Sequence, residues 1–166
     1  MKFNPYDDVY HANSAVSSVA INSLTGSSAV NGDSLDTVLA GLEALLVHVR
    51  GEIASGSPTT STLAWKLQES SDNSTWADAQ DNSGATIGAT LNVKTTAQDS
   101  YARVEGINLY QGNAAAPQGG RKRYLRIVLT PAFTSGTSPA ILAYAEFIGV
   151  TGNGALLPVR TAVSNT

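Results

Sequence analysis

The feature that most constrains the fold is a period-two alternation of apolar and polar residues in short segments. In residues 124–130, Leu125, Ile127 and Leu129 alternate with polar neighbours, and Pro131 follows. Alternation of this kind places every second side chain on one side of a β-strand. Clusters of Gly, Ser, Thr, Asn and Pro separate the segments, as turns separate strands. The pattern predicts an all-β protein and predicts that Pro131 ends this strand.

The same alternation recurs along the chain. It places Leu63, Trp65 and Leu67 on one side of segment 63–69, so we expect Trp65 in the core. In segment 45–53 it separates Leu45, Val47, Val49 and Ile53 from Leu46, His48, Arg50 and Glu52. Further strands are expected at 14–21, 86–93, 101–109 and 140–150.

The number and spacing of these segments predict the fold class. About seven or eight short strands with regular turn signals favour an antiparallel β-sandwich, jelly-roll-like in arrangement, over a βαβ fold. The stretch 34–46 has helix-like spacing, but Gly41 interrupts it. We expect a turn or a helical turn there, leading into the strand.

The chain of 166 residues is the size of one domain. Residues 14–150 carry the strand pattern and form the expected sandwich. Residues 1–13 are polar and unpatterned, and residues 151–166 form a weakly apolar tail containing Leu156 and Leu157. We expect these two segments to be extended N- and C-terminal arms.

Charge and composition exclude several classes of partner. The net charge of −3 gives no strong positive field, so we expect no nucleic-acid partner. No apolar run approaches the roughly twenty residues that span a bilayer, so we expect no membrane association. The N-terminal residues lack the apolar core of a signal peptide, which predicts folding in the compartment of synthesis. With Cys 0, the chain has no disulfide and no thiolate.

The sequence offers no convincing catalytic, cofactor-binding or metal-binding residues, and we expect no enzyme. General acid–base chemistry would fall to His11 or His48. His11 lies in the polar N-terminal arm, and His48 is expected to serve packing or an interface. Asp72, Asp78 and Asp81 lack the pattern of a calcium loop. Asp72 and Asn73 are instead typical of a turn.

Two features could bind a partner. The first is the basic run Arg121-Lys122-Arg123 with the nearby Arg126, for which a polar strand entry or an inter-subunit salt-bridge patch is favoured over nucleic acid. The second is Trp76, which with Tyr101, Tyr110 and Tyr144 could form a sugar-stacking platform. A tryptophan that closes a hairpin also packs over the end of a sheet, and both alternatives stay open.

Two stretches resemble a known protein family. Residues Leu67 to Asp78 are similar to the pattern L-Q-E-S-x-D-x-S-x-W-x-D of small β-sandwich proteins encoded by tailed bacteriophages. Residues Arg123 to Pro131, followed by Gly136 to Ala140, resemble their segment R-Y-L-R-x-x-x-T-P … G-T-S-P-A. Together the stretches cover about a third of the chain. The resemblance is to capsid decoration, or cement, proteins.

The resemblance implies a structural protein without catalysis. It implies a jelly-roll-like sandwich, often a homotrimer, that binds the major capsid protein on the outside of the virion after synthesis in the bacterial cytoplasm. Subunit or capsid contacts are expected from the arms and the basic run, and the candidate residues are Phe3, Tyr6, Tyr10, Arg121, Arg123, Arg126, Leu156 and Leu157. The alternative hypothesis is a carbohydrate- or receptor-binding sandwich of a tail or fibre.

Overall fold

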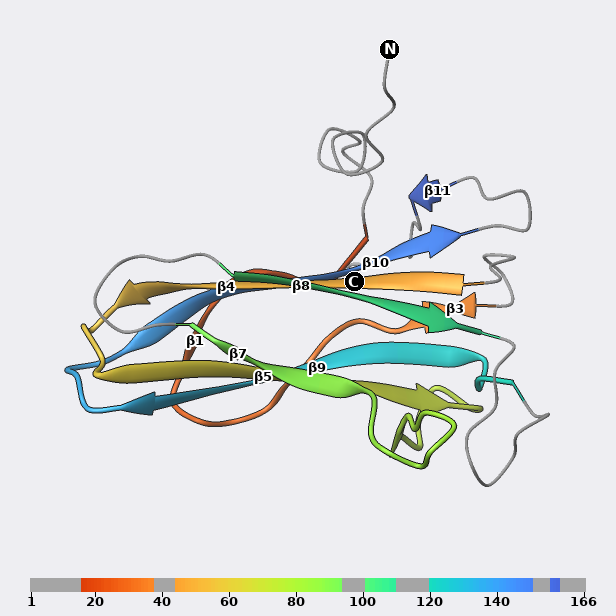
Figure 1. The fold of residues 1–166 in the computed structure, drawn as a ribbon, viewed down its shortest axis with the longest axis horizontal. Coiled ribbons are helices and arrows are strands. Elements are labelled where there is room, and N and C mark those ends of the chain that lie inside the picture. Colours follow the sequence, from red (N-terminus) through yellow and green to blue (C-terminus); the bar gives the residue numbers. More distant parts are fainter. Residues whose placement is uncertain (1–15, 38–43, 94–100, 110–119, 151–155, 159–166) are drawn as a thin grey trace, which may run out of the picture.

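The computed structural model describes residues 16–37, 44–93, 101–109, 120–150 and 156–158. Their strands form two antiparallel sheets that lie face to face as two layers, with β4, β8 and β10 in one layer and β5, β7 and β9 in the other (Figure 1). This is the antiparallel β-sandwich that the sequence predicts.

The first layer, sheet A, has the strand order β1-β10-β4-β8. Its strands are β1 (Val16–Thr25), β10 (Ala140–Val150), β4 (Ala44–Ser55) and β8 (Tyr101–Asn108), and β11 (Leu156–Pro158) also pairs with β10. The second layer, sheet B, has the order β2-β9-β5-β6. Its strands are β2 (Val30–Asn31), β9 (Tyr124–Thr134), β5 (Thr60–Ser70) and β6 (Ala77–Asp78), with β3 (Leu35–Asp36) beside β9 and β7 (Gly88–Asn92) beside β5.

The core lies between the sheets and follows the predicted alternation. On β5, Leu63, Trp65 and Leu67 are buried, which confirms Trp65 as a core residue. On β9 and β4 the predicted apolar sides are also turned inward, and on β10 the inward side chains are Ile141, Ala143, Ala145 and Phe147. Strands β4 and β5 are consecutive in the chain but belong to different sheets, and the same holds for β9 and β10. At each of these connections the chain passes from one sheet to the other, as it does in a jelly roll.

The prediction that Pro131 ends its strand is wrong, because β9 continues to Thr134. The reason lies in the direction of the backbone groups. On the β2 side, Gly32 donates its N–H to the carbonyl of Ile127, while on the β5 side Thr59 donates to Thr134. Pro131 shares the odd-numbered direction of Ile127, and β2 pairs only with residues 128 and 129. Its missing N–H therefore faces the edge where β2 has ended, where no hydrogen bond is lost.

The stretch 34–46 contains a short strand that the sequence did not predict, while Thr37, which follows this strand, is helical, in agreement with the expected helical turn. Leu35–Asp36 is the short strand β3, which pairs with β9 and buries Leu35 completely. Residues 38–43 lie outside the described residues. The leucine spacing that looked helical thus includes at least one inward-facing strand position, which periodicity alone cannot separate from a helical one.

The β4–β5 and β9–β10 turns meet at one end of the sandwich. Thr137 donates its N–H to the carbonyl oxygen of Gly56 over 3.2 Å. Gly136 has φ +94°, and a Cβ there would lie 2.4 Å from the Gly56 carbonyl oxygen. Only glycine fits both the conformation and the space. The close approach of the two turns therefore explains why the G-T-S-P-A stretch begins with glycine.

The two predicted arms are described only in part. Residues 1–13, with Phe3, Tyr6, Tyr10 and His11, lie outside the described residues. In the C-terminal segment, Leu156 and Leu157 belong to β11 and pair with Val150 and Gly149 of β10. This pairing adds three residues of the predicted tail to sheet A, where the sequence suggested no partner strand.

Candidate functional site

The arginines of the basic run all bind within the chain. Arg123 makes a forked pair with Asp36, with Nε and Nη2 donating to the carboxylate over 3.0 and 2.7 Å. This interaction raises the pKa of Arg123. Arg126 donates from Nε and Nη2 to the Gln68 Oε1 over 2.9 and 2.7 Å. Each guanidinium thus has an internal partner, and their predicted contact with another subunit stays a prediction.

Arg126 also connects the two stretches that carry the family resemblance. Its guanidinium lies 4.3 Å from the centre of the Trp76 ring, within the range of a cation–π interaction. Gln68 also donates to Asp78 over 2.8 Å, and Lys66 donates to the same carboxylate. These bonds lower the pKa of Asp78. Lys66, Gln68, Trp76, Asp78 and Arg126 therefore form one network on the outer side of sheet B.

The turn between β5 and β6 is held by Asp72. Its Oδ1 accepts hydrogen bonds from the backbone N–H of Ser74 and Thr75, over 2.9 and 2.7 Å, and from the Ser70 hydroxyl over 2.8 Å. The bonds to Thr75 and Ser74 are the main reason that the pKa of Asp72 lies well below its ordinary value. Asn73 has φ 58°, which asparagine tolerates. The predicted turn role of Asp72 and Asn73 is confirmed.

The outer side of sheet A carries a second polar cluster, around His48. Its Nδ1 lies 2.7 Å from the Glu146 Oε1, and the side chains are 5% and 4% exposed. Tyr144 donates its hydroxyl hydrogen to the other oxygen of Glu146. The register places His48 directly opposite Glu146 on neighbouring strands, which explains the contact. His48 therefore packs against the Glu146 carboxylate and the Tyr144 ring on the outer side of sheet A.

Trp76 and Tyr144 do not share a surface. Trp76 lies over Arg126 on the outer side of sheet B, whereas Tyr144 lies beside Glu146 on the outer side of sheet A. The two rings are half-buried and separated by the core. They cannot form one coplanar platform. Tyr110 and the side chain of Tyr101 lie outside the part of the chain that is described at side-chain level.

A buried ion pair closes the end of the core near the Asp72 turn. Arg121 Nη1 lies 3.8 Å from Glu69 Oε2, and the two side chains are 5% and 6% exposed. Arg121 also donates from Nη1 to the Gln80 carbonyl and from its backbone N–H to the Leu109 carbonyl. Leu109 follows β8 of sheet A, while Glu69 and Gln80 belong to the sheet B side. Arg121 therefore links the two sheets.

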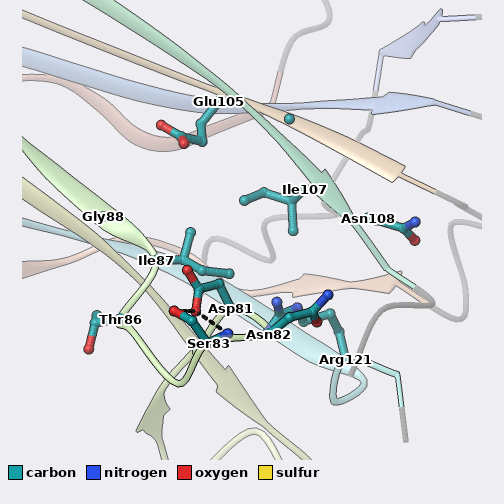
Figure 2. Close-up of a pocket in the computed structure, with 11 residues that line it drawn as sticks. Asp81, Asn82, Ser83, Thr86, Ile87, Gly88, Glu105, Ile107, Asn108 and Arg121 are labelled. Carbon is teal, nitrogen blue, oxygen red and sulfur yellow. Dashed lines mark hydrogen bonds between the residues drawn. The ribbon is translucent and has the colours of Figure 1, made fainter. Parts of the chain in front are cut away.

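Beside Arg121, a groove opens between β8 and the loop that precedes β7. It has a volume of about 440 Å³. Figure 2 shows Glu105 and Ile107 pointing from β8 toward Ile87 and Gly88 on the opposite side. The remaining lining residues are Asp81, Asn82, Ser83, Thr86, Gly106, Asn108 and Arg121. None of the lining residues in the described part of the chain is aromatic, and neither Trp76 nor Tyr144 is among them.

The sequence reasoning missed Glu69, Glu146 and the groove. The alternation that places Leu63, Trp65 and Leu67 inward also places Glu69 inward, and this signal was sufficient to flag it. Glu146 lies between the inward residues Ala145 and Phe147, and only the register with β4 reveals its partner. The groove forms from two distant segments and has no local sequence signal.

The described residues lack two further kinds of feature. No set of three or more His, Cys, Asp or Glu side chains among them is arranged to hold a metal ion. Within the same residues, no helix has the length and apolar character needed to cross a membrane.

Comparison with known proteins gives little support for any family. No protein-family model matches the chain, and no curated protein matches it significantly. One similar solved structure is "Family 16 Carbohydrate Binding Module-2", at 11% sequence identity and a TM-score of 0.33, covering 75% of this chain and 70% of that chain. A likeness this distant transfers no ligand and no function. The assignment of the sandwich rests on the strand pairing itself.

Proposed function

We propose that the chain is a non-enzymatic structural protein of a tailed-bacteriophage virion, which binds the outer surface of the capsid between capsomers and stabilises the head. The observation that carries the proposal is the contact between the two stretches that resemble decoration proteins. Arg126, from the second stretch, bonds Gln68 and stacks on Trp76, both from the first. The two stretches lie on the paired strands β5 and β9 and on the turn after β5, so the residues that carry the resemblance form one continuous surface of sheet B.

The proposed partner is the major capsid protein, and the proposed assembly is a homotrimer. A trimer brings three copies of one contact to a capsid surface that is itself symmetric. Linked contacts give an avidity that a single weak contact lacks. The arms, with Phe3, Tyr6, Tyr10, Leu156 and Leu157, remain the proposed contact segments.

The surface composition supports this role. Only 14% of residues are charged, and the described arginines 121, 123 and 126 are already bonded within the chain. Covering such a surface leaves few charges without partners, which is the costly event in forming an interface. The virion exterior is therefore the proposed location, with synthesis in the bacterial cytoplasm.

The proposal is tested with heads from a phage whose copy of this gene is disrupted. The purified chain is mixed with these heads and sedimented, and its mass in solution is measured separately. We expect saturable binding, a trimeric mass and a higher temperature of DNA release from the decorated heads. Absence of binding at micromolar concentration contradicts the proposal.

Truncated chains sharpen the same test. Removal of residues 1–12 and, separately, of residues 152–166 is expected to reduce capsid occupancy or the oligomer mass. Unchanged occupancy and mass in both truncated chains would remove the arms from the proposal. The alternative, a carbohydrate- or receptor-binding module of a tail or fibre, loses its proposed platform because Trp76 and Tyr144 lie on opposite sides of the sandwich.

A further inference from the structure

Two arginine–aromatic pairs lie next to each other on the outer side of sheet B. The Arg126 guanidinium lies 4.3 Å from the centre of the Trp76 ring. The Arg123 guanidinium lies 5.0 Å from the centre of the Tyr124 ring. Tyr124 and Arg126 are alternate residues of β9, so their side chains point to the same side of the sheet. These four residues are named the arginine–aromatic surface below. Arg, Trp and Tyr are the side chains most enriched at the energetic centres of protein interfaces.

Both guanidinium groups of this surface are held in place by bonds within the chain. Arg123 donates from Nε and Nη2 to the Asp36 carboxylate over 3.0 and 2.7 Å. Arg126 donates from the same two atoms to Gln68 Oε1 over 2.9 and 2.7 Å. A guanidinium whose orientation is already fixed loses less side-chain freedom when a partner binds. The surface is therefore preorganised for contact.

Arg126 has no carboxylate partner in the part of the chain that the structure describes. It bonds the neutral Gln68, and the nearby Asp78 is paired with Lys66 at 2.8 Å. Arg126 is half-buried, and burial lowers its pKa. A partly desolvated positive charge without a counter-charge is stabilised when a carboxylate approaches it. Charge complementarity therefore favours an acidic group on the partner.

The surroundings of Arg126 fit a protein partner better than nucleic acid. The net charge of −3 opposes the approach of a polyanion. The half-buried rings of Trp76 and Tyr124 add apolar area beside the charge, as in the centre of a protein interface. Arg121 is not part of this surface, because its side chain is only 5% exposed.

We propose that the arginine–aromatic surface is the face that binds the major capsid protein, with Arg126 paired to a carboxylate of that protein. This inference rests on the proposed function and deepens it, because it names the surface and the chemistry of the contact. The contact adds to those proposed for the terminal arms.

The experiment compares two glutamine variants in the head-binding assay. Arg126→Gln removes the charge that lacks a carboxylate partner and keeps a polar side chain next to Gln68. Arg50→Gln removes an exposed charge from the outer side of sheet A and is the matched control. We expect Arg126→Gln to weaken binding to the heads about tenfold, the effect of one arginine at the centre of an interface. Arg50→Gln is expected to bind as tightly as the unchanged chain.

The dependence on salt tests the chemistry of the contact. Salt screens an arginine–carboxylate pair, so the difference between the unchanged chain and Arg126→Gln is expected to shrink at high ionic strength. Urea denaturation shows whether Arg126→Gln is folded under the assay conditions. Arg123→Gln is the second variant, because its side chain is 45% exposed and its fold depends less on the change. It is expected to weaken binding about three- to tenfold.

The outcomes separate this inference from the proposed function. If the unchanged chain binds and the folded Arg126→Gln and Arg123→Gln chains bind equally well, the surface is overturned and the proposed function stands. If no chain binds the heads, both are overturned. An equal loss in Arg50→Gln, or a difference that persists at high ionic strength, also overturns the inference. A lower mass in solution for Arg126→Gln than for the unchanged chain would make the surface a subunit interface and overturn it as well.

Discussion

The outer sides of the two sheets carry side-chain pairs with similar N···O distances in opposite environments. On sheet A, His48 and Glu146 lie 2.7 Å apart with side chains 5% and 4% exposed. On sheet B, Lys66 and Asp78 lie 2.8 Å apart with side chains 39% and 38% exposed. A buried pair must stay complete because a lone buried charge is costly, whereas water replaces a missing partner at the surface. Burial, and not distance, sets the energetic weight of each pair.

The largest effect is expected from His48→Ala. This change leaves the buried Glu146 carboxylate without its imidazole partner and is expected to lower the free energy of unfolding by about 3 kcal/mol. Urea denaturation measures this loss. A loss below about 0.5 kcal/mol in His48→Ala, the scale of an ordinary surface change, would contradict the comparison.

Arg126→Ala is expected to have an intermediate effect. It removes the bonds to Gln68 and the stacking on Trp76, which lie at the half-buried centre of the sheet B network. The expected loss is about 1–2 kcal/mol. Trp76 also loses its cover, so its fluorescence emission is expected to move to longer wavelength. Arg50→Ala, at an exposed arginine on sheet A, is the control and is expected to leave the emission unchanged. An unchanged spectrum in Arg126→Ala would show that the stacking does not persist in solution.

Acidification is expected to affect the sheet B side through its aspartates. Hydrogen bonds lower the pKa values of Asp72, Asp78 and Asp81 below their ordinary value of 3.8. Between the unfolded and folded pKa values the unfolded chain binds more protons, so stability rises with pH in that window. The stabilisation is present above about pH 4 and decreases as the pH falls further. Thermal melts at pH 7 and pH 3 are expected to differ less in Asp78→Asn than in the unchanged chain. An equal difference would contradict the role of Asp78.

The smallest effect is expected from Lys66→Ala. The Lys66–Asp78 pair is more than a third exposed, and Gln68 still donates to Asp78 after the change. A change within about 0.5 kcal/mol is expected. Comparison of this variant with His48→Ala in the same denaturation series tests the contrast directly. Equal losses would show that burial does not distinguish the two faces.

The fold could be predicted from the sequence because the apolar positions of the alternating segments all face one hydrophobic core. Trp65 and Phe147 take the inward positions that the period-two pattern predicts. Pro131 could not be placed correctly, because its tolerance depends on where β2 ends. That is a property of the neighbouring strand and not of Pro131 itself.

The polar sites were less accessible to sequence reasoning. The turn role of Asp72 follows from residues within three positions of it and was predicted. The pairs of His48 with Glu146 and of Arg121 with Glu69 join residues that are far apart in the chain. The first pair depends on which residues lie opposite each other in β4 and β10, and the second depends on which segments meet at the end of the core. No local sequence pattern encodes either arrangement.

The most direct test of the proposed function is a density map of the virion that contains this chain. The account predicts β-sandwich density on the outside of the shell, at symmetric positions between capsomers, that disappears when the gene is disrupted. Density confined to the tail or a fibre, or an unchanged shell after disruption, would contradict it.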